Sequence, residues 1–144
     1  MNLSRAAKVT RVSNAVAAGT TDINSSSVDM ANFDSVQFVV AFGTITATAV
    51  TSCKLQTSSD DSSFNDLTGT AITVADDDDN QVVVLDLGKP LERYIRCTVD
   101  RGTANAVVDG IFCQQYLAGN QPVTHDATSV VDSEFTLAPA EGTA

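Results

Sequence analysis

The sequence predicts an all-β protein, an antiparallel β-sandwich of jelly-roll type with extended N- and C-terminal arms. Val, Thr, Ile and Ala dominate the chain, and such residues favour strands over helices. Several short segments alternate apolar with polar residues, as a strand does when one of its faces is buried. Polar turns separate these segments at short spacing, which is typical of sandwiches and jelly rolls.

The first clear strand covers residues 35–43. Its inward face is formed by Val36, Phe38, Val40 and Phe42. Gly43 marks a bend, and residues 44–51 alternate Thr with Ile or Ala, which predicts a second strand directly after the first. A third strand follows, and one of its faces carries Cys53, Leu55 and Thr57.

The later part of the chain continues in the same way. Residues 71–75 predict a short strand and residues 81–87 a longer one. The inward side chains of the longer strand are Val83, Leu85 and Leu87. Residues 91–100 predict the next strand, whose inward side chains are Ile95, Cys97 and Val99. The last strand, residues 104–117, is interrupted by Gly110, which indicates a bulge or a kink.

The extent of this alternation sets the expected domain boundaries. We expect a basic N-terminal arm over residues 1–20, the sandwich over residues 21–120 and an extended tail over residues 121–144. Residues 6–18 within the arm fit either a strand or a short helix. Neither end is expected to add much to the core, and both should be ordered mainly by contact with neighbouring subunits. The apolar tail residues able to anchor on a neighbour are Val130, Val131, Phe135 and Leu137.

The charge of the chain is uneven. Eight basic residues against eighteen acidic ones give a net charge of −10, which disfavours binding to nucleic acid and to anionic membranes. Three of the basic residues, Arg5, Lys8 and Arg11, lie in the first thirteen positions, where no Asp or Glu occurs. These three residues are therefore expected either to contact an acidic partner surface or to form a solvated terminus.

The three cysteines point to buried thiols rather than to a metal or a disulfide framework. Cys53, Cys97 and Cys113 show no CxxC spacing and have no histidine near them in sequence. We interpret each as a small apolar residue inside a strand, in a protein that matures in a reducing cytoplasm. No cofactor-binding motif such as GxGxxG occurs, so no cofactor is expected.

Little in the sequence supports catalysis, and no enzyme is expected. The single histidine, His125, lies in the expected tail, where the rigid orientation that a catalytic base needs is missing. Asp109 lies beside Gly110, and we interpret it as a carboxylate at a bulge or a sheet edge. Residues 76–79 are four successive Asp, whose oxygens are suitable for calcium, but the spacing of an EF-hand is absent and a solvated loop is the favoured interpretation.

Two stretches carry more specific information. Residues 55–67 run from a strand through a turn rich in Ser and Asp to Phe64, which predicts a hairpin whose ring folds back over the end of the sandwich. Residues 91–99 contain Arg-Tyr-Ile-Arg shortly after a proline. Arg93 is expected to fork onto a carboxylate or loop carbonyls at the end of a sheet, which is a structural role like that of Phe64. Arg96 is expected on the outer face, where it covers the sheet or reaches a partner.

Over about residues 35–123 this combination resembles the capsid-decoration, or cement, proteins of tailed bacteriophages. That resemblance implies a structural virion protein that binds the outer surface of a capsid and clamps neighbouring copies of the major capsid protein. The same features also resemble discoidin-type carbohydrate-binding jelly rolls, which usually carry Gly and Trp where this chain has Ser63 and Phe64. The second resemblance implies a carbohydrate- or receptor-binding module of a virion.

The strand over residues 104–117 bears on the oligomeric state. Val107 and Ile111 are expected to point opposite to Val108 and Phe112, so both faces of this strand would be buried, one of them against a sister subunit. We therefore expect a homotrimer. Under the leading resemblance it is made in the host cytoplasm and located on the capsid exterior of the virion.

Overall fold

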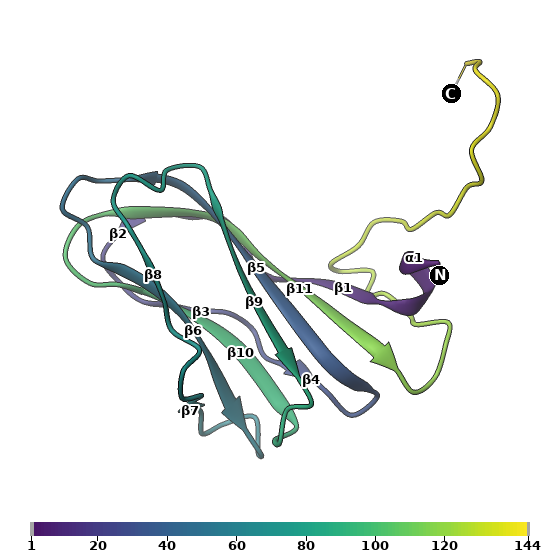
Figure 1. Ribbon diagram of the computed structural model, residues 1–144, viewed down its shortest axis with the longest axis horizontal. Coiled ribbons are helices and arrows are strands. Elements are labelled where there is room, and N and C mark those ends of the chain that lie inside the picture. The colour runs from purple at the N-terminus through teal and green to yellow at the C-terminus, as the bar shows by residue number, and fades with distance from the viewer. Residues whose placement is uncertain (1, 144) are drawn as a thin grey trace.

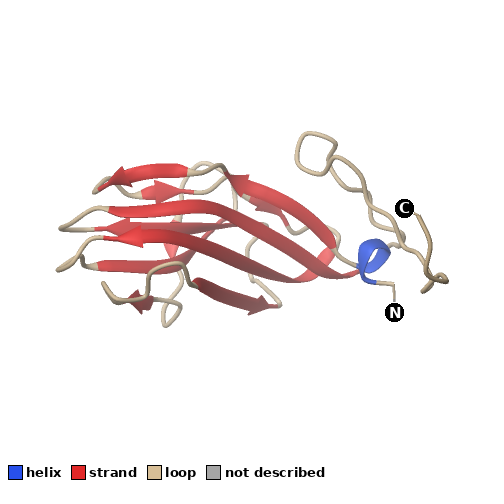
Figure 2. Ribbon diagram, turned by 90° about the horizontal axis from the view of Figure 1, so that it is seen from above, coloured by secondary structure: helices blue, strands red, loops and turns tan. Residues whose placement is uncertain are grey.

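The protein consists of two antiparallel sheets packed face to face (Figure 1, Figure 2). The structure is a computed structural model that describes residues 2–143. The strands of the first sheet lie in the order β1 (Lys8–Ser13), β11 (Ala106–Ala118), β5 (Phe33–Ile45) and β9 (Val82–Gly88). A further short strand, β2 (Val16–Gly19), also pairs with β11.

The second sheet lies against the first. Its order is β3 (Ile23–Asn24), β10 (Tyr94–Arg101), β6 (Thr51–Ser58) and β7 (Asn65–Asp66). Two short strands also belong to this sheet, β4 (Val28–Asp29) beside β10 and β8 (Ile72–Val74) beside β6. The chain crosses between the sheets from β5 to β6 and from β8 to β9. It crosses again from β9 to β10 and from β10 to β11. The predicted all-β, antiparallel sandwich is confirmed.

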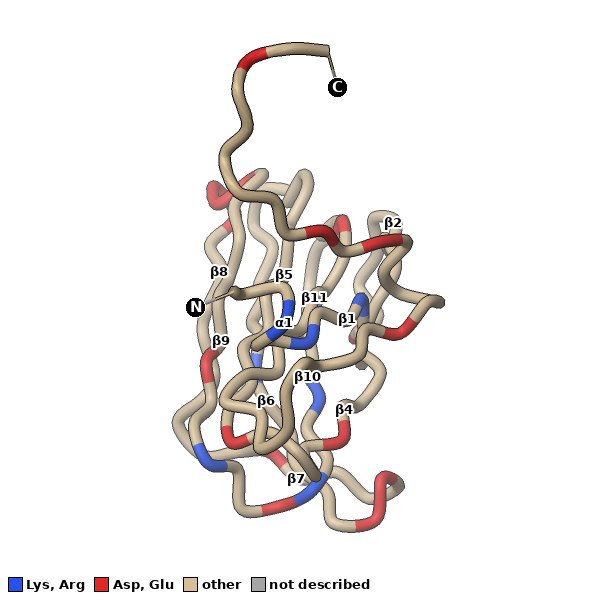
Figure 3. Tube along the Cα trace, turned by 90° about the vertical axis from the view of Figure 1, so that its right-hand side faces the viewer, with Lys and Arg blue, Asp and Glu red and all other residues tan. Residues whose placement is uncertain are grey.

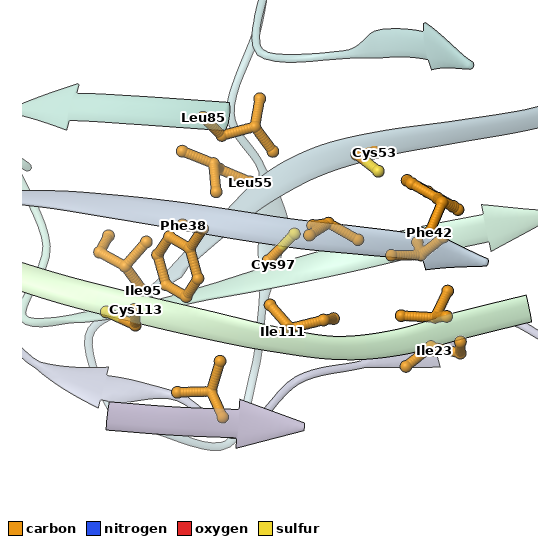
Figure 4. Packing of buried hydrophobic residues seen from close by; sticks show 14 of the residues in the cluster. Ile23, Phe38, Phe42, Cys53, Leu55, Leu85, Ile95, Cys97, Ile111 and Cys113 are labelled. Atoms are coloured by element: carbon orange, nitrogen blue, oxygen red, sulfur yellow. The ribbon is translucent and has the colours of Figure 1, made fainter. Parts of the chain in front are cut away.

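The core lies between the sheets (Figure 4). The inward side chains predicted for residues 35–43 are all buried there, namely Val36, Phe38, Val40 and Phe42. The three cysteines are free and buried, as interpreted from the sequence. Burial raises the pKa of the Cys97 thiol to about 12 and also raises the pKa values of Cys53 and Cys113.

β11 contains the irregularity predicted at Gly110. Its pairing with β5 shifts register between Ala106 and Val108 and again between Val108 and Gly110. The shift turns Val108 and Ile111 onto the same fully buried face, whereas Phe112 points outward and is 37% exposed. The expected opposition of Val108 and Ile111 is therefore wrong, because it assumed an unbroken alternation through the bulge.

Residues 44–51 do not form the separate strand that their alternation predicts. β5 continues to Ile45, and β6 begins at Thr51. Between them the chain turns, and the backbone N–H of Ala49 donates to the carbonyl of Thr46 at 3.0 Å. Thr and Ala alternate in this segment and provide no large side chain for the core. Forming a turn instead of a strand therefore loses few core contacts.

Part of the expected N-terminal arm belongs to the sandwich. A single helical turn, α1 (Leu3–Ala6), is followed by β1 and β2, which both pair with β11. Val12 of β1 is buried in the core. This finding corrects the expectation that residues 1–13 add little to the core and that the sandwich begins after residue 20. An edge strand needs few inward apolar side chains. The charged residues of β1 therefore favoured its interpretation as a basic arm.

The end of the chain is extended, as predicted. Residues 119–143 contain no helix or strand, and beyond α1 the tail leaves the body of the sandwich (Figure 1). Among residues 2–143, no helix is long and apolar enough to cross a membrane.

Candidate functional site

The outer face of the second sheet carries a polar network. Arg96 of β10 places its guanidinium 4.0 Å from the ring centre of Phe64 and donates through Nε to Gln56 at 2.8 Å. Gln56 donates to Asp66 at 2.7 Å, and Lys54 pairs with the same carboxylate at 2.7 Å. The hydrogen bonds from Lys54 and Gln56 lower the pKa of Asp66. Arg96 thus lies on the outer face, as expected, and its guanidinium contacts other residues of the same chain.

Arg93 forms a fork at the end of the same sheet. Its Nε and a terminal nitrogen donate to the two carboxylate oxygens of Asp29 at 2.9 and 2.7 Å. The guanidinium also lies 5.3 Å from the ring centre of Tyr94. The hydrogen bond from Arg93 holds the pKa of Asp29 below its ordinary value. The side chains of Arg93 and Asp29 are 56% and 44% exposed, so this is a surface ion pair.

The turn that precedes Phe64 is organised by Asp60. Its Oδ1 accepts hydrogen bonds from the backbone N–H groups of Ser62 and Ser63 at 2.9 and 2.8 Å and from the Ser58 hydroxyl at 2.8 Å. The bonds from the backbone of Ser63 and Ser62 lower the pKa of Asp60. They also give the turn a defined shape, and this shape brings the ring of Phe64 back to Arg96.

The outer face of the first sheet has the opposite character. In cross-strand register, Phe112 of β11 lies beside Val39 of β5, which lies beside Val84 of β9. Val82 and Val84 are 58% and 46% exposed. At the other end of the row, Arg11 of β1 holds its guanidinium 5.7 Å from the ring centre of Phe112. We call Val39, Val82, Val84 and Phe112 the apolar face.

The sequence analysis did not single out Val82 or Val84. It assigned the inward face of this strand to Val83, Leu85 and Leu87, of which Leu85 is buried and the other two pack against the core. The signal for a second contact surface was the unbroken run of three valines, because such a run is apolar on both faces of a strand.

A groove lies between α1 and the outer face of the first sheet. Its volume is 340 Å³, and its walls include Leu3 and Ala7 on one side and Gln114 and Leu117 of β11 on the other. An adjoining groove of 470 Å³ shares Leu3, Ala7 and Gln114 with it and reaches Phe135 of the tail. We call the first of these cavities the α1 groove.

Of the three basic residues expected either to contact a partner or to form a solvated terminus, Arg5 and Arg11 lie on the side of this groove. Lys8 pairs in register with the buried Gln115, so it faces the opposite side of the sheet. Arg5 belongs to α1, and Lys8 and Arg11 belong to β1 (Figure 3). The tail passes next to them, since the N–H of Val123 donates to the carbonyl of Arg5 at 2.9 Å. Hydrogen bonds within the tail, aided by the charge of Lys8, lower the pKa of Asp126.

The first part of the tail covers the free edge of β1. His125 Nδ1 accepts a hydrogen bond from the N–H of Val9 at 3.2 Å, and its Nε2 lies 2.9 Å from the carbonyl oxygen of Ser4. Because a carbonyl oxygen can only accept, Nε2 carries the ring proton. The N–H of Arg11 donates to the hydroxyl of Ser129. Both ring nitrogens of His125 are thus bound to backbone groups, which makes this residue a connector between tail and strand.

Carboxylates of the acidic run over residues 76–79 accept hydrogen bonds from backbone N–H groups at several different places. Asp76 accepts from the N–H of Thr48, and Asp79 accepts from the N–H of Ile45. Asp78 accepts from the N–H of Ala75 and the side chain of Gln81. Among residues 2–143 no three His, Cys, Asp or Glu side chains are placed to hold a metal ion together. The carboxylates hold the loop between β8 and β9 against the end of β5.

Arg101 is a buried residue that lies between the two strands expected over residues 91–100 and 104–117. β10 extends to this residue, which is 4% exposed. Its guanidinium donates to the carbonyls of Thr21 at 2.7 Å, Ala17 at 2.8 Å and Ala106 at 2.8 Å. Arg101 therefore connects β2 and the segment after it to the start of β11.

Comparison with known proteins shows the fold. No protein-family model matches the chain, and no curated protein matches its sequence. The PBSX exported protein XepA is similar in structure, with a TM-score of 0.55 and 17% identity over 94% of this chain and 45% of that one. The chain therefore spans less than half the length of XepA. The C-terminal family 22 carbohydrate-binding module of Clostridium thermocellum Xyn10B overlaps more loosely, with a TM-score of 0.41 and 17% identity over 82% of this chain and 88% of the module.

Proposed function

We propose that this chain is a non-enzymatic structural protein of a virion, which binds the outer surface of a phage capsid and clamps neighbouring capsid subunits. The observation that carries the proposal is the contrast between the two outer faces. On the outer face of the second sheet, Arg96, Gln56 and Asp66 bind one another, whereas the first sheet exposes the apolar face in cross-strand register. An exposed apolar surface of this kind marks a site of protein–protein contact.

The mechanism is stabilisation by selective binding. A protein that contacts two neighbouring capsid subunits at once binds the assembled shell and not the separate subunits, so it shifts the equilibrium towards the shell. The apolar face contributes buried area, and the cation of Arg11, which lies over Phe112, contributes attraction to an acidic capsid surface together with the other basic residues of the N-terminal segment, Arg5 and Lys8. In this proposal the partner is the major capsid protein, and the location is the capsid exterior.

The alternative is a carbohydrate- or receptor-binding module. Arg96 and the ring of Phe64 do lie over the outer face of the second sheet, and Arg93 and Tyr94 contact each other at its end, as a sugar platform would require. However, the guanidinium of Arg96 already covers the ring of Phe64 at 4.0 Å, and Arg93 is held by Asp29. A sugar would have to displace these contacts before stacking, which favours the structural role.

The experiment is co-sedimentation of the purified protein with empty capsids. Val84→Asp places a charge in the middle of the apolar face, and we expect it to weaken capsid binding by at least about tenfold. Val50→Asp is the matched control, because Val50 is 63% exposed in the loop between β5 and β6 and lies off this face.

Two results would contradict the proposal. One is equal capsid binding by the Val84→Asp and Val50→Asp proteins. The other is the absence of capsid binding by the unmodified protein together with glycan binding that Arg96→Ala abolishes. The second result would establish the carbohydrate-binding alternative.

A further inference from the structure

We propose that the tail segment over residues 131–137 of one copy docks into the α1 groove of a second copy. The occupant of the groove is thus the tail of a second copy of this chain. This inference goes beyond capsid attachment, and its test needs only the purified protein. Failure of capsid binding would therefore leave it standing, and its own failure would leave the capsid proposal standing.

The tail segment has the pattern of a strand that lacks a partner. Residues 131–137 read Val-Asp-Ser-Glu-Phe-Thr-Leu, so in an extended conformation Val131, Phe135 and Leu137 share one face. Phe135 is 56% exposed and Leu137 is 78% exposed. The opposite face carries Asp132 and Glu134. Large apolar side chains at alternate positions of an extended segment are the pattern by which peptides fill apolar grooves beside a sheet.

The α1 groove is complementary to this segment in shape and polarity. Leu3, Ala7 and Leu117 give it apolar walls, and its 340 Å³ can receive a large side chain. Leu3 and Leu117 are 56% and 61% exposed, so the groove leaves apolar surface in water when it is empty. Filling it would bury apolar surface of the groove and of the tail at the same time.

The charges are also complementary. The tail from residue 121 onward carries four acidic residues and no Lys or Arg. The groove is lined by Leu3, Ala6 and Ala7, which flank Arg5 of α1, and Arg11 of β1 lies on the same outer face of the sheet beside Phe112. A segment with Asp132 and Glu134 on its outer side would therefore be attracted to the rim of the groove.

The chain's own tail indicates the route but leaves the α1 groove open. Phe135 borders the adjoining groove, which shares Leu3, Ala7 and Gln114 with the α1 groove. Two residues later Leu137 is exposed, and the tail runs away from the body (Figure 1). Every copy therefore offers one exposed apolar tail and one open groove. A tail-to-groove contact joins two different surfaces, so successive contacts can close into a ring such as a trimer.

Disulfide trapping between two full-length chains tests the contact. Leu137→Cys is introduced into one chain and Leu3→Cys into a second chain of different tag, and the mixture is oxidised. The three native thiols are buried, so the introduced thiols react first. We expect a crosslinked heterodimer, and we expect the control pair Leu137→Cys with Val50→Cys to crosslink at least about tenfold less.

A reversible measurement complements the trapping. In sedimentation equilibrium, Phe135→Ser with Leu137→Ser should weaken self-association at least about tenfold, and Leu3→Asp should do the same from the groove side. Mixing the tail variant with the Leu3→Asp variant should restore pairing, since the mixture holds one intact groove and one intact tail. Val50→Ser is the control and should leave association unchanged.

The proposal is overturned by any of three results. The first is that the unmodified protein remains monomeric across the concentration range. The second is that self-association persists undiminished in both the tail variant and the Leu3→Asp variant. The third is that a chain carrying both Leu3→Cys and Leu137→Cys forms an intramolecular disulfide at all concentrations, while the mixed single-cysteine chains do not crosslink. The last result would mean that each tail folds back onto its own groove.

Discussion

Arg101 offers the sharpest test of the fold, because a buried cation there has only backbone carbonyls as partners. Replacing it with Met keeps an unbranched side chain but removes the donors to Thr21, Ala17 and Ala106. Hydrogen bonds from a charged donor contribute about 1.5–3 kcal/mol each, and the three together are offset by several kcal/mol for burying the cation. We expect a net loss of about 3 kcal/mol in the free energy of unfolding.

The corresponding fall in Tm follows from the size of the chain. An unfolding entropy of about 2.1 cal/mol/K per residue gives about 0.3 kcal/mol/K for 144 residues, so the loss corresponds to about 10 °C. The assay is thermal and urea unfolding followed by far-UV circular dichroism, since the chain contains no Trp. Arg93→Met is the matched control on the same strand region. Its partner Asp29 is half exposed, so its Tm should fall by less than half as much.

An outcome of equal stability for the Arg101→Met protein and the unmodified protein would refute this reasoning. It would mean that water or the relaxed backbone satisfies the three carbonyls as well as the guanidinium does. A larger fall for Arg93→Met than for Arg101→Met would refute it equally, because burial would then not decide the strength of these contacts.

Three further predictions concern polar groups, thiols and acid. Thr51→Val should raise the free energy of unfolding, measured in urea, by about 1 kcal/mol, because the buried Thr51 hydroxyl has no hydrogen-bond partner. Thr98→Val should lower the free energy of unfolding, because the Thr98 hydroxyl donates to Asn24 at 2.8 Å. The three cysteine thiols should react with a disulfide reagent such as DTNB only as the protein unfolds in urea, and fast reaction of the folded protein would contradict their burial. The pKa of Asp29 is lower in the folded protein than its ordinary value of 3.8, so its stabilising contribution is present above pH 3.8 and is lost as the pH falls through the folded pKa. Urea titrations should therefore show the stabilities of the Arg93→Met and unmodified proteins converging as the pH falls below 3.8.

The sequence predicted the central strands well because burial on one face dictates their pattern. β5 and β10 place large apolar residues at every second position, and no other arrangement buries them all. A strand was one of two alternatives for residues 6–18, but the place of β1 in the sandwich was missed, because this edge strand buries Val12 while its outward residues include Arg11. The bulge at Gly110 was predicted, but its effect on the direction of Ile111 depends on register, which the sequence does not contain.

The candidate surfaces were predicted in part for similar reasons. The outward position of Arg96 could be inferred from alternation along β10, whereas Arg93 precedes that strand and was assigned from its place at the end of the sheet. The apolar face requires β5, β9 and β11 to be neighbours, and that order is a property of the topology. Phe112 and Val84 are far apart in sequence, so no local pattern joins them.

The tail's cover over β1 shows how a segment without secondary structure replaces a strand. Val9 and Arg11 direct their N–H groups outward from the edge of β1, roughly 6.6–6.8 Å apart along the strand. A turn in the tail, closed by the bond from the N–H of Val130 to the carbonyl of Asp126 at 2.9 Å, brings residues four apart in sequence to a similar spacing. His125 and Ser129 are four apart, so one turn presents two side-chain acceptors to two donors of the strand. This protects the edge from pairing with another chain while leaving the tail beyond Val130 free to bind elsewhere.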